Sequence, residues 1–458
     1  MVLGRKFAQF VEGSPVSVMM RGIVEYTFDE ERLDELFERT AEAQYTRLLP
    51  FSTVADLMSE VVFGISPSIG AAYQANSEAI PVSRRSVYNK LNGIEPQVAA
   101  ALVSDSAKRL APVIEKLKAT VPPLLTGYRT KILDGNHFSA TEHRIEELRT
   151  IGDAPLPGKA LVVLDPQLQL AIDVFPCEDG HAQERSLLGQ VLSRVEGKDF
   201  WIADRNFCTL GFLFGIQARR AKFLIREHAG LPRQLVGKRK YCGRINGGRV
   251  YEQGIDLADP ETGQEMRARR ITIVLNKATR DGATEIHLVT NLPVRAATAK
   301  RLAILYRKRW TIETMFQELT ETLTCEISTL GYPRAAILAF CLALAAYNGI
   351  SVIKAALRSM HGGEVVEETV SGYYISVEIS KTYTGMMISI PAKEWRVFRQ
   401  MSASQLARVL KDLAANVDLQ KYKKHGRGPK KPPPDRIYRG RSNHVSTARI
   451  LARRKTAI

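Results

Sequence analysis

The spacing of apolar residues changes along the chain, and the changes divide it into regions. From residue 1 to about 125, apolar positions recur at the intervals of amphipathic helices. The expected helices cover residues 28–44, 52–63 and 98–117. This pattern predicts a helical N-terminal domain.

One further helix of that domain has an unusual surface. In P-V-S-R-R-S-V-Y-N-K-L-N-G, residues 81–93, Ser83 can cap the helix and Gly93 can end it. With Val87 and Leu91 facing inward, the polar side chains on the other face resemble those of a DNA-recognition helix. An ordinary basic surface helix fits the pattern equally well. We interpret residues 1–125 as a DNA-end-binding domain.

Period-two alternation begins near residue 126. Expected strands cover 130–134, 160–165, 168–175, 199–204 and 222–226, and expected helices cover 181–195 and 209–219. Three strands followed by helix, strand, helix and strand is the order of a ribonuclease H-like core. Residues 126–226 would form the first part of that core.

The next region has no long helical period. Residues 227–295 are rich in Gly, Arg, Thr and Val, with turn signals between short strand-like runs, and predict a mostly-β insertion. Residues 296–360 return to helix and would complete the core. The apolar run at 335–350 is short for a membrane span and predicts a buried core helix. Residues 361–458 form a C-terminal region, and the fold class is α/β.

Three acidic residues stand at informative places in this α/β pattern. Asp134 and Asp204 end predicted strands, and Glu313 lies on a predicted helix. Most such aspartates, taken singly, are turn residues. If the core folds as expected, the three carboxylates converge, and their mutual repulsion requires cations. Hard oxygen ligands select Mg²⁺ or Mn²⁺, and two such ions can align an in-line phosphoryl transfer.

The expected helix around Glu313 carries further polar groups. In Y-R-K-R-W-T-I-E, Tyr306 and Arg309 precede Glu313 at spacings that stack the three side chains on one helix face. A phenol and a guanidinium there suit phosphate oxygens. Trp310 could stack on a base, but a place in the core is the favoured interpretation. An apolar stripe for packing is formed by Ile312, Phe316, Leu319 and Leu323.

The charge composition predicts that the protein binds a polyanionic partner. The formal net charge is +17, and residues 421–458 contain thirteen Lys or Arg against one acid, Asp435. A solvated basic extension is one interpretation, and a flexible arm that follows a nucleic-acid backbone is the favoured one. Five scattered cysteines, with no C-x-x-C pair, suggest a reducing cytosol. We expect no signal peptide and no membrane span.

Several motifs together resemble a known family. D-G at Asp134, D-R-N-F at Asp204, T-N-L-P at 290–293 and Y-R-K-R-W-x-I-E-x-x-F from Tyr306 occur in that order. They are similar to the signatures of bacterial insertion-sequence transposases of the DDE type, in the IS-four family. The resemblance covers roughly residues 120–458. It departs at Thr320, where the family signature has a lysine that contacts DNA.

The resemblance implies a mechanism and a partner. Asp134, Asp204 and Glu313 would be the catalytic residues and bind two Mg²⁺ or Mn²⁺ ions, while Tyr306, Arg309 and Thr320 would contact DNA. The enzyme would cut the ends of a mobile element and join them to target DNA as a homodimer in the bacterial cytoplasm. Three alternatives stay open: a nuclease of the same fold, a non-catalytic DNA-binding derivative, and a basic RNA-binding protein.

Overall fold

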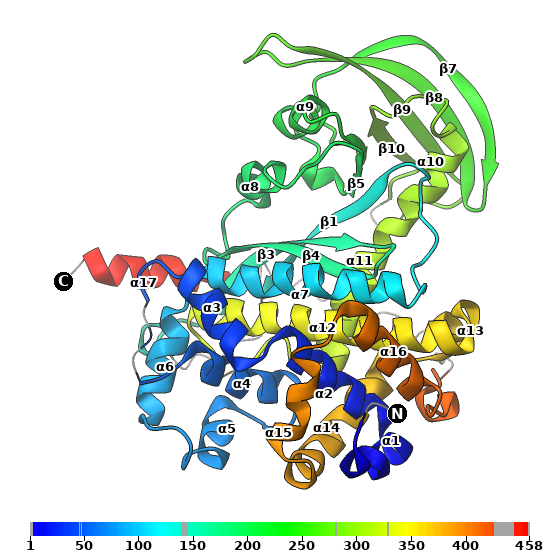
Figure 1. Ribbon diagram of the computed structural model, residues 1–458. Helices are drawn as coiled ribbons and strands as arrows, with labels where there is room; N and C mark the ends of the chain where they lie inside the picture. The colour runs from blue at the N-terminus through cyan, green and yellow to red at the C-terminus, as the bar shows by residue number, and fades with distance from the viewer. Residues whose placement is uncertain are drawn as a thin grey trace.

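A computed structural model describes residues 3–44, 46, 48–138, 145–279, 282–327, 329–425 and 444–456. The chain combines a large mixed β-sheet with many helices, as the α/β prediction requires. Figure 1 shows one part of the sheet lying on a thick helical layer, and the other part rising away from that layer. The elements that carry the acidic residues lie where these two parts meet.

The sheet has nine strands in the order β4-β3-β1-β5-β6-β10-β9-β8-β7. Its first five strands are β1 (Arg129–Phe138), β3 (Gly158–Asp165), β4 (Leu170–Cys177), β5 (Asp199–Ala203) and β6 (Lys222–Arg226). Strands β1, β3 and β4 are antiparallel neighbours, whereas β5 and β6 run parallel to β1. The helices between them are α8 (Leu188–Leu192) and α9 (Leu210–Ala218), which confirms the predicted order of elements.

Strand β1 is longer than the sequence indicates. The prediction ended it at Asp134, but it continues to Phe138, and Asp134 pairs with Val162 of β3. Its pairing with β5 does stop at Leu133 and Ala203. The expectation that Asp134 ends its strand is therefore wrong on the β3 side, because antiparallel pairing with β3 holds the chain extended beyond the end of β5.

The predicted mostly-β region continues the same sheet. It consists of β7 (Gln234–Ile245), β8 (Gly248–Ala258), β9 (Glu265–Leu275) and β10 (Glu285–Thr290). Strand β10 hydrogen-bonds to β6, so these strands extend the sheet that contains β1 and β5. The outermost strand, β7, has bulges and exposed lysine and arginine side chains, which discourage further pairing at that edge.

The helical layer combines the N-terminal helices with helices from after residue 330. Its larger members are α2 (Pro15–Thr27), α3 (Glu30–Thr40), α4 (Phe51–Val62), α6 (Arg84–Gly93), α7 (Pro96–Lys116), α12 (Pro333–His361), α14 (Gly372–Ser389) and α16 (Ala403–Ala414). Smaller helices are α1 (Ala8–Gly13), α5 (Ile69–Ala75), α13 (Gly363–Thr369) and α15 (Ala392–Trp395). The segment 367–391, whose structure the sequence left open, is therefore mostly helical.

The central helix of this layer is α12. By length and composition it could cross a membrane, but 89% of its most apolar window is buried inside the protein, as expected of a core helix. One buried amide fixes its position on the sheet: Asn348 accepts from the Ala171 N–H at 2.8 Å and donates to the Ser106 hydroxyl at 2.8 Å. These bonds join α12 to β4 and to α7 without leaving the amide unsatisfied.

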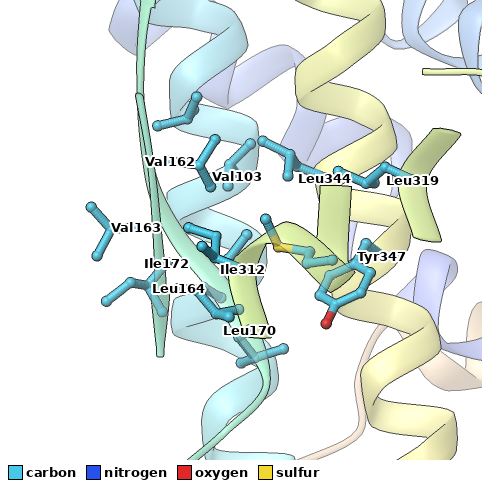
Figure 2. Packing of buried hydrophobic residues seen from close by; sticks show 14 of the residues in the cluster. Val103, Val162, Val163, Leu164, Leu170, Ile172, Ile312, Leu319, Leu344 and Tyr347 are labelled. Atoms are coloured by element: carbon cyan, nitrogen blue, oxygen red, sulfur yellow. The ribbon is translucent and has the colours of Figure 1, made fainter. Parts of the chain in front are cut away.

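The acid-bearing helix is held by apolar packing. Figure 2 shows Leu319 of α11 (Trp310–Thr322) close to Leu344 and Tyr347 of α12, and Ile312 of α11 close to Leu164 and Leu170 of the sheet. Ile312 and Leu319 are buried, which confirms the predicted stripe. Because this face is fixed between the sheet and α12, the opposite polar face has a fixed direction as well.

The helix around Glu313 is not continuous, contrary to the expectation. It divides into α10 (Ala299–Tyr306), a 3₁₀ turn (Arg307–Arg309) and α11. Tyr306, Arg309 and Glu313 therefore belong to three successive elements. A 3₁₀ turn has three residues per turn in place of 3.6, so it rotates α11 relative to α10 and redirects the side chains on either side.

The described part of the C-terminal tail returns to the sheet region. Strand β11 (His444–Ser446) pairs with the short strand β2 (Ala154–Leu156), and α17 (Thr447–Thr456) follows it. Asp179 accepts hydrogen bonds from the Ser446 hydroxyl at 2.6 Å and from Arg449 Nε at 2.8 Å. The predicted flexible arm, H-G-R-G-P-K-K-P-P-P, lies almost entirely in residues 426–443, outside the described residues.

Candidate active site

Asp134 and Asp204 occupy equivalent places on two adjacent strands. The last pair of the parallel β1–β5 ladder is Leu133 with Ala203; Asp134 is the next residue of β1, and Asp204 is the first residue after β5. Residues at one register position of parallel neighbours have side chains on the same face. Asp204 is also the N-cap of a 3₁₀ turn (Arg205–Phe207), where its Oδ1 accepts from the Arg205 N–H at 2.6 Å.

Arg309 joins Asp134 to Glu313. Its Nη1 lies 2.8 Å from Asp134 Oδ2, and its Nη2 lies 2.6 Å from Glu313 Oε1. The side chain of Arg309 is only 10% exposed, and that of Asp134 18%, whereas that of Glu313 is 36% exposed. One guanidinium therefore forms a partly buried bridge between a β1 carboxylate and an α11 carboxylate.

Two polar atoms in this cluster lack a well-aligned protein partner. The Tyr306 hydroxyl and Arg309 Nε are buried and make no hydrogen bond of good geometry within the part of the chain that the structure describes, although the guanidinium of Arg309 lies close to the phenol. Tyr306 is 7% exposed, and burial together with the charge of Asp204 raises the pKa of its phenol. Leaving such groups unpaired costs stability, about 1–3 kcal/mol each. A ligand with acceptor oxygens would remove that cost.

The electrostatic state of Asp134 reflects its burial. Burial raises the pKa of Asp134 to about 6, and the negative charges of Glu313 and Asp204 add to this effect. The guanidinium of Arg309 and the Gly135 N–H, 3.0 Å from Asp134 Oδ1, act in the opposite direction. Two acids and Arg309 thus act on Asp134, and all four groups belong to one charged cluster.

Comparison with known proteins identifies the segment that contains this cluster. Residues 126–348 match a family model described as a transposase DDE domain. The matched segment is 223 of the 458 residues, so the similarity to this family covers just under half of the chain. Such domains use divalent metal ions such as Mg²⁺ to cleave DNA. The matched segment includes Asp134, Asp204 and Glu313.

Comparisons with solved structures and with curated proteins give no further information about the site. A piggyBac transposase synaptic complex with hairpin DNA is similar in structure, at a TM-score of 0.36 and 10% identity, over 91% of this chain and 88% of that chain. At that score the likeness carries no argument about individual residues. No curated protein matches the chain.

The carboxylate oxygens around Arg309 are of the type that binds a hard divalent ion. All three acids of the cluster offer carboxylate oxygens, and two of them already share a cationic group. As the side chains stand, however, no three acidic, histidine or cysteine residues within the described ranges are grouped closely enough to hold a metal ion. Arg309 occupies the position between Asp134 and Glu313, and Asp204 is turned to its own backbone.

Two other residues of the α11 segment differ in their placement. Thr320 is exposed, and its hydroxyl donates to the Phe316 carbonyl at 3.0 Å. Trp310 is 60% exposed, so the expectation that it fills the core is wrong. Its ring lies beside the guanidinium of Arg309, 5.3 Å from centroid to Cζ, and the apolar stripe of α11 faces the other way.

The sequence reasoning missed Glu184. This residue begins a 3₁₀ turn (Glu184–Leu187), and its carboxylate accepts from the Asn206 side-chain amide, two residues after Asp204. The same carboxylate lies directly over Gly135, where an added Cβ would stand 2.2 Å from Glu184 Oε1. The absence of a side chain at Gly135 therefore leaves room for Glu184.

A second bond reinforces this link, since Arg185 Nε donates to the Asn206 carbonyl at 2.8 Å. The β1–β5 ladder ends before the two aspartates, so its hydrogen bonds do not fix their separation. Glu184 spans that gap by contacting both Gly135 and Asn206. The only sequence signals were the glycine after Asp134 and the asparagine in D-R-N-F.

Proposed function

We propose that this protein is a DNA transposase that cuts the ends of an insertion sequence and joins them to target DNA. The observation that carries the proposal is the cluster of Asp134, Asp204 and Glu313 around Arg309, inside the segment that matches a transposase DDE domain. The strand order β4-β3-β1-β5-β6 supports a ribonuclease H-like core. The Y-x₂-R-x₃-E spacing supports membership of the IS-four family.

In this proposal the three carboxylates hold two Mg²⁺ or Mn²⁺ ions. When bound, these ions would activate the attacking water or hydroxyl and stabilise charge on the phosphate. The chain itself would supply position: Asp134 and Asp204 directly follow the last pair of the β1–β5 ladder, Glu184 contacts both segments, and apolar packing fixes the direction of α11, which carries Glu313. No covalent protein intermediate is needed, because alignment and charge stabilisation carry the reaction.

DNA phosphates would be bound by the two buried groups that lack well-aligned partners. The Tyr306 hydroxyl and Arg309 Nε are donors in a partly buried setting, where hydrogen bonds to a charged phosphate are strong. Exposed Trp310 beside them offers an apolar face on which a nucleotide base could stack. Thr320 would contact the backbone farther along α11.

A wider DNA surface is supported by basic helices from both ends of the chain. In α6 the cap Ser83 accepts from the Ser86 N–H at 3.2 Å, while Arg84, Arg85 and Asn89 are exposed. Tyr88 of α6 and Arg454 of α17 line the same hollow. Residues 1–125 and the basic tail would thus act together, and two copies would bring two element ends together. The cytoplasm is the proposed location.

The decisive experiment is Mg²⁺-dependent cleavage of the inverted repeats that flank the gene, with the wild type and Glu313→Gln. We expect the wild type to nick these ends and the variant to lose at least about a hundredfold in rate, because a carboxylate that meets the transition state is gone. Equal cleavage by both proteins would contradict the proposal. A strand-transfer assay with pre-cleaved ends then separates a transposase from a nuclease that cuts without joining.

A further inference from the structure

Arg309 faces two demands that cannot be met together. Each of its terminal nitrogens is bonded to a different carboxylate, Asp134 at 2.8 Å and Glu313 at 2.6 Å. A phosphate that approached this guanidinium in its present place would also approach those two carboxylates. Because like charges at such distances repel strongly in a partly buried site, phosphate binding competes with the carboxylate bridge.

The same bridge competes with metal binding. A divalent ion would bind the same two carboxylates, each of which now gives one oxygen to Arg309, and it would stand close to a guanidinium that stays charged at any working pH. In the free protein Arg309 thus supplies the positive charge that Asp134 and Glu313 require. The bridge leaves Arg309 Nε and the adjacent Tyr306 hydroxyl without well-aligned partners, so the present arrangement does not satisfy the donors on the phosphate side.

We propose that Arg309 couples the binding of DNA to the binding of metal. A phosphate of the DNA end draws the guanidinium away from Asp134 and Glu313, and the two carboxylates become free for divalent ions only then. The proposal rests on the proposed function of the three acids. It makes Arg309 a positioning residue, acting through the carboxylates as well as on the phosphate.

Thermodynamic linkage gives the consequence. If DNA removes the competing guanidinium, it must raise the affinity for the metal, and the metal must raise the affinity for DNA by the same factor. Couplings of this kind are commonly about 5- to 150-fold. Such an enzyme would hold its ions weakly until an element end is in place, which limits hydrolysis of other DNA.

The test measures Mn²⁺ affinity by isothermal titration, without and with a pre-cleaved duplex that carries the flanking inverted repeat. For the full-length wild type we expect the duplex to tighten Mn²⁺ binding by about tenfold or more. For Arg309→Gln we expect Mn²⁺ to bind tightly without DNA, and the duplex to change the affinity by less than about twofold. Arg309→Lys should lie between them, because one ammonium cannot bridge both carboxylates as a guanidinium does.

Two results would contradict the proposed role of Arg309. If Arg309→Gln weakens Mn²⁺ binding, Arg309 merely holds the carboxylates in place, and the proposal is wrong. It is also wrong if the variant keeps the full effect of DNA. Arg267→Gln is the matched control, since it breaks an arginine–carboxylate pair, 2.6 Å from Asp256, on the outer strands. It should leave Mn²⁺ affinity unchanged.

Two further variants separate this inference from the proposed function. Asp134→Asn and Glu313→Gln should each abolish the Mn²⁺ site with or without DNA. If both bind Mn²⁺ as the wild type does, the three acids are not metal ligands and the proposed function fails. If they lose the site while Arg309→Gln behaves as the wild type, only the role of Arg309 fails.

Discussion

The two ends of the β1–β5 strand pair are built on opposite electrostatic principles. At the end where both strands begin, Lys131 Nζ lies 2.7 Å from Asp199 Oδ2, and the two side chains are 4% and 2% exposed. Nearby, Arg129 Nε lies 2.9 Å from Asp165 Oδ2. At the other end, Arg309 is bonded to two carboxylates, those of Asp134 and Glu313, while the acids Asp204 and Glu184 belong to the same region.

Hydrogen bonds follow the same division. The Lys131 ammonium also donates to the Arg194 carbonyl at 3.2 Å, and Asp199 accepts from the Glu196 N–H at 2.8 Å. The end that carries Asp134 and Asp204 contains the buried Tyr306 hydroxyl and Arg309 Nε, which have no well-aligned partner in the described chain. One end thus pairs its charged groups, although the buried Thr130 hydroxyl and Trp201 indole N–H there also lack partners in the described chain, whereas the other end leaves donors unpaired beside the acids.

The largest effect on stability is expected at the end of the β1–β5 pair where Lys131 and Asp199 pair, which we call the balanced end. Replacing Lys131 by Met leaves the Asp199 carboxylate buried without its counter-charge, which should cost about 3–5 kcal/mol of unfolding free energy. Urea unfolding followed by circular dichroism measures this cost. The double variant Lys131→Met with Asp199→Leu should recover most of it, since no buried charge remains. A single variant as stable as the wild type would remove the contrast between the two ends.

An intermediate effect is expected from Glu184, which links the two acid-bearing segments. Without its carboxylate, Glu184→Ala releases the Asn206 amide and loosens the spacing of Asp134 and Asp204. Mn²⁺ affinity should fall about tenfold, the range found for groups that orient metal ligands. Glu184→Gln keeps an acceptor for Asn206 and should recover most of the affinity. Equal losses in both variants would show that orientation through Asn206 is not its role.

A smaller effect is expected from Thr320→Lys, which restores the charge of the family signature. One added phosphate contact should tighten binding to the end duplex several-fold and steepen the dependence of log affinity on log salt by about 0.9. Titrations at a series of salt concentrations measure both quantities. Thr369→Lys is the control, because Thr369 also donates to its own helix backbone, at 2.7 Å from Val365 O. An unchanged salt slope for Thr320→Lys would defeat the prediction.

The smallest effect concerns Asp173, a carboxylate near the balanced end. Burial raises its pKa, against the opposing charges of Arg194, Lys131, Lys108 and Arg129. A raised folded-state pKa stabilises the protein below the ordinary pKa, and this contribution is lost as the pH rises through the raised value. Asp173→Asn cannot ionise, so its stability relative to the wild type should increase as the pH rises from the ordinary aspartate pKa of about 4 through the raised pKa. Unfolding midpoints across this range should diverge, and parallel curves would contradict the assignment.

The sequence predicted the elements of the sheet well where their patterns were local. The strand at 222–226 has the predicted bounds, and residues 227–295 form strands as predicted. Val87 and Leu91 are buried in α6 as expected. Each of these features depends on period, capping or turn chemistry within one short segment.

Features that depend on a neighbour were not predictable in this way. The extension of β1 beyond Asp134 comes from pairing with β3, and the 3₁₀ turn after Tyr306 joins two helices that pack separately. Trp310 faces outward because α11 turns its stripe to the sheet and α12. The role of Glu184 required knowing that 49 residues of chain return it to Gly135.

By itself the sequence singled out the candidate residues for the chemistry, because Asp134, Asp204 and Glu313 stand out by residue type, order and local pattern. Only the tertiary structure decided their surroundings: Asp134 and Asp204 directly follow the last pair of a parallel ladder, and Arg309 is bonded to Asp134 and Glu313. The physical reason is the distance along the chain over which each kind of interaction acts. Backbone preferences act over a few residues, whereas the pairing of charges depends on distances set by the packed sheet and helices.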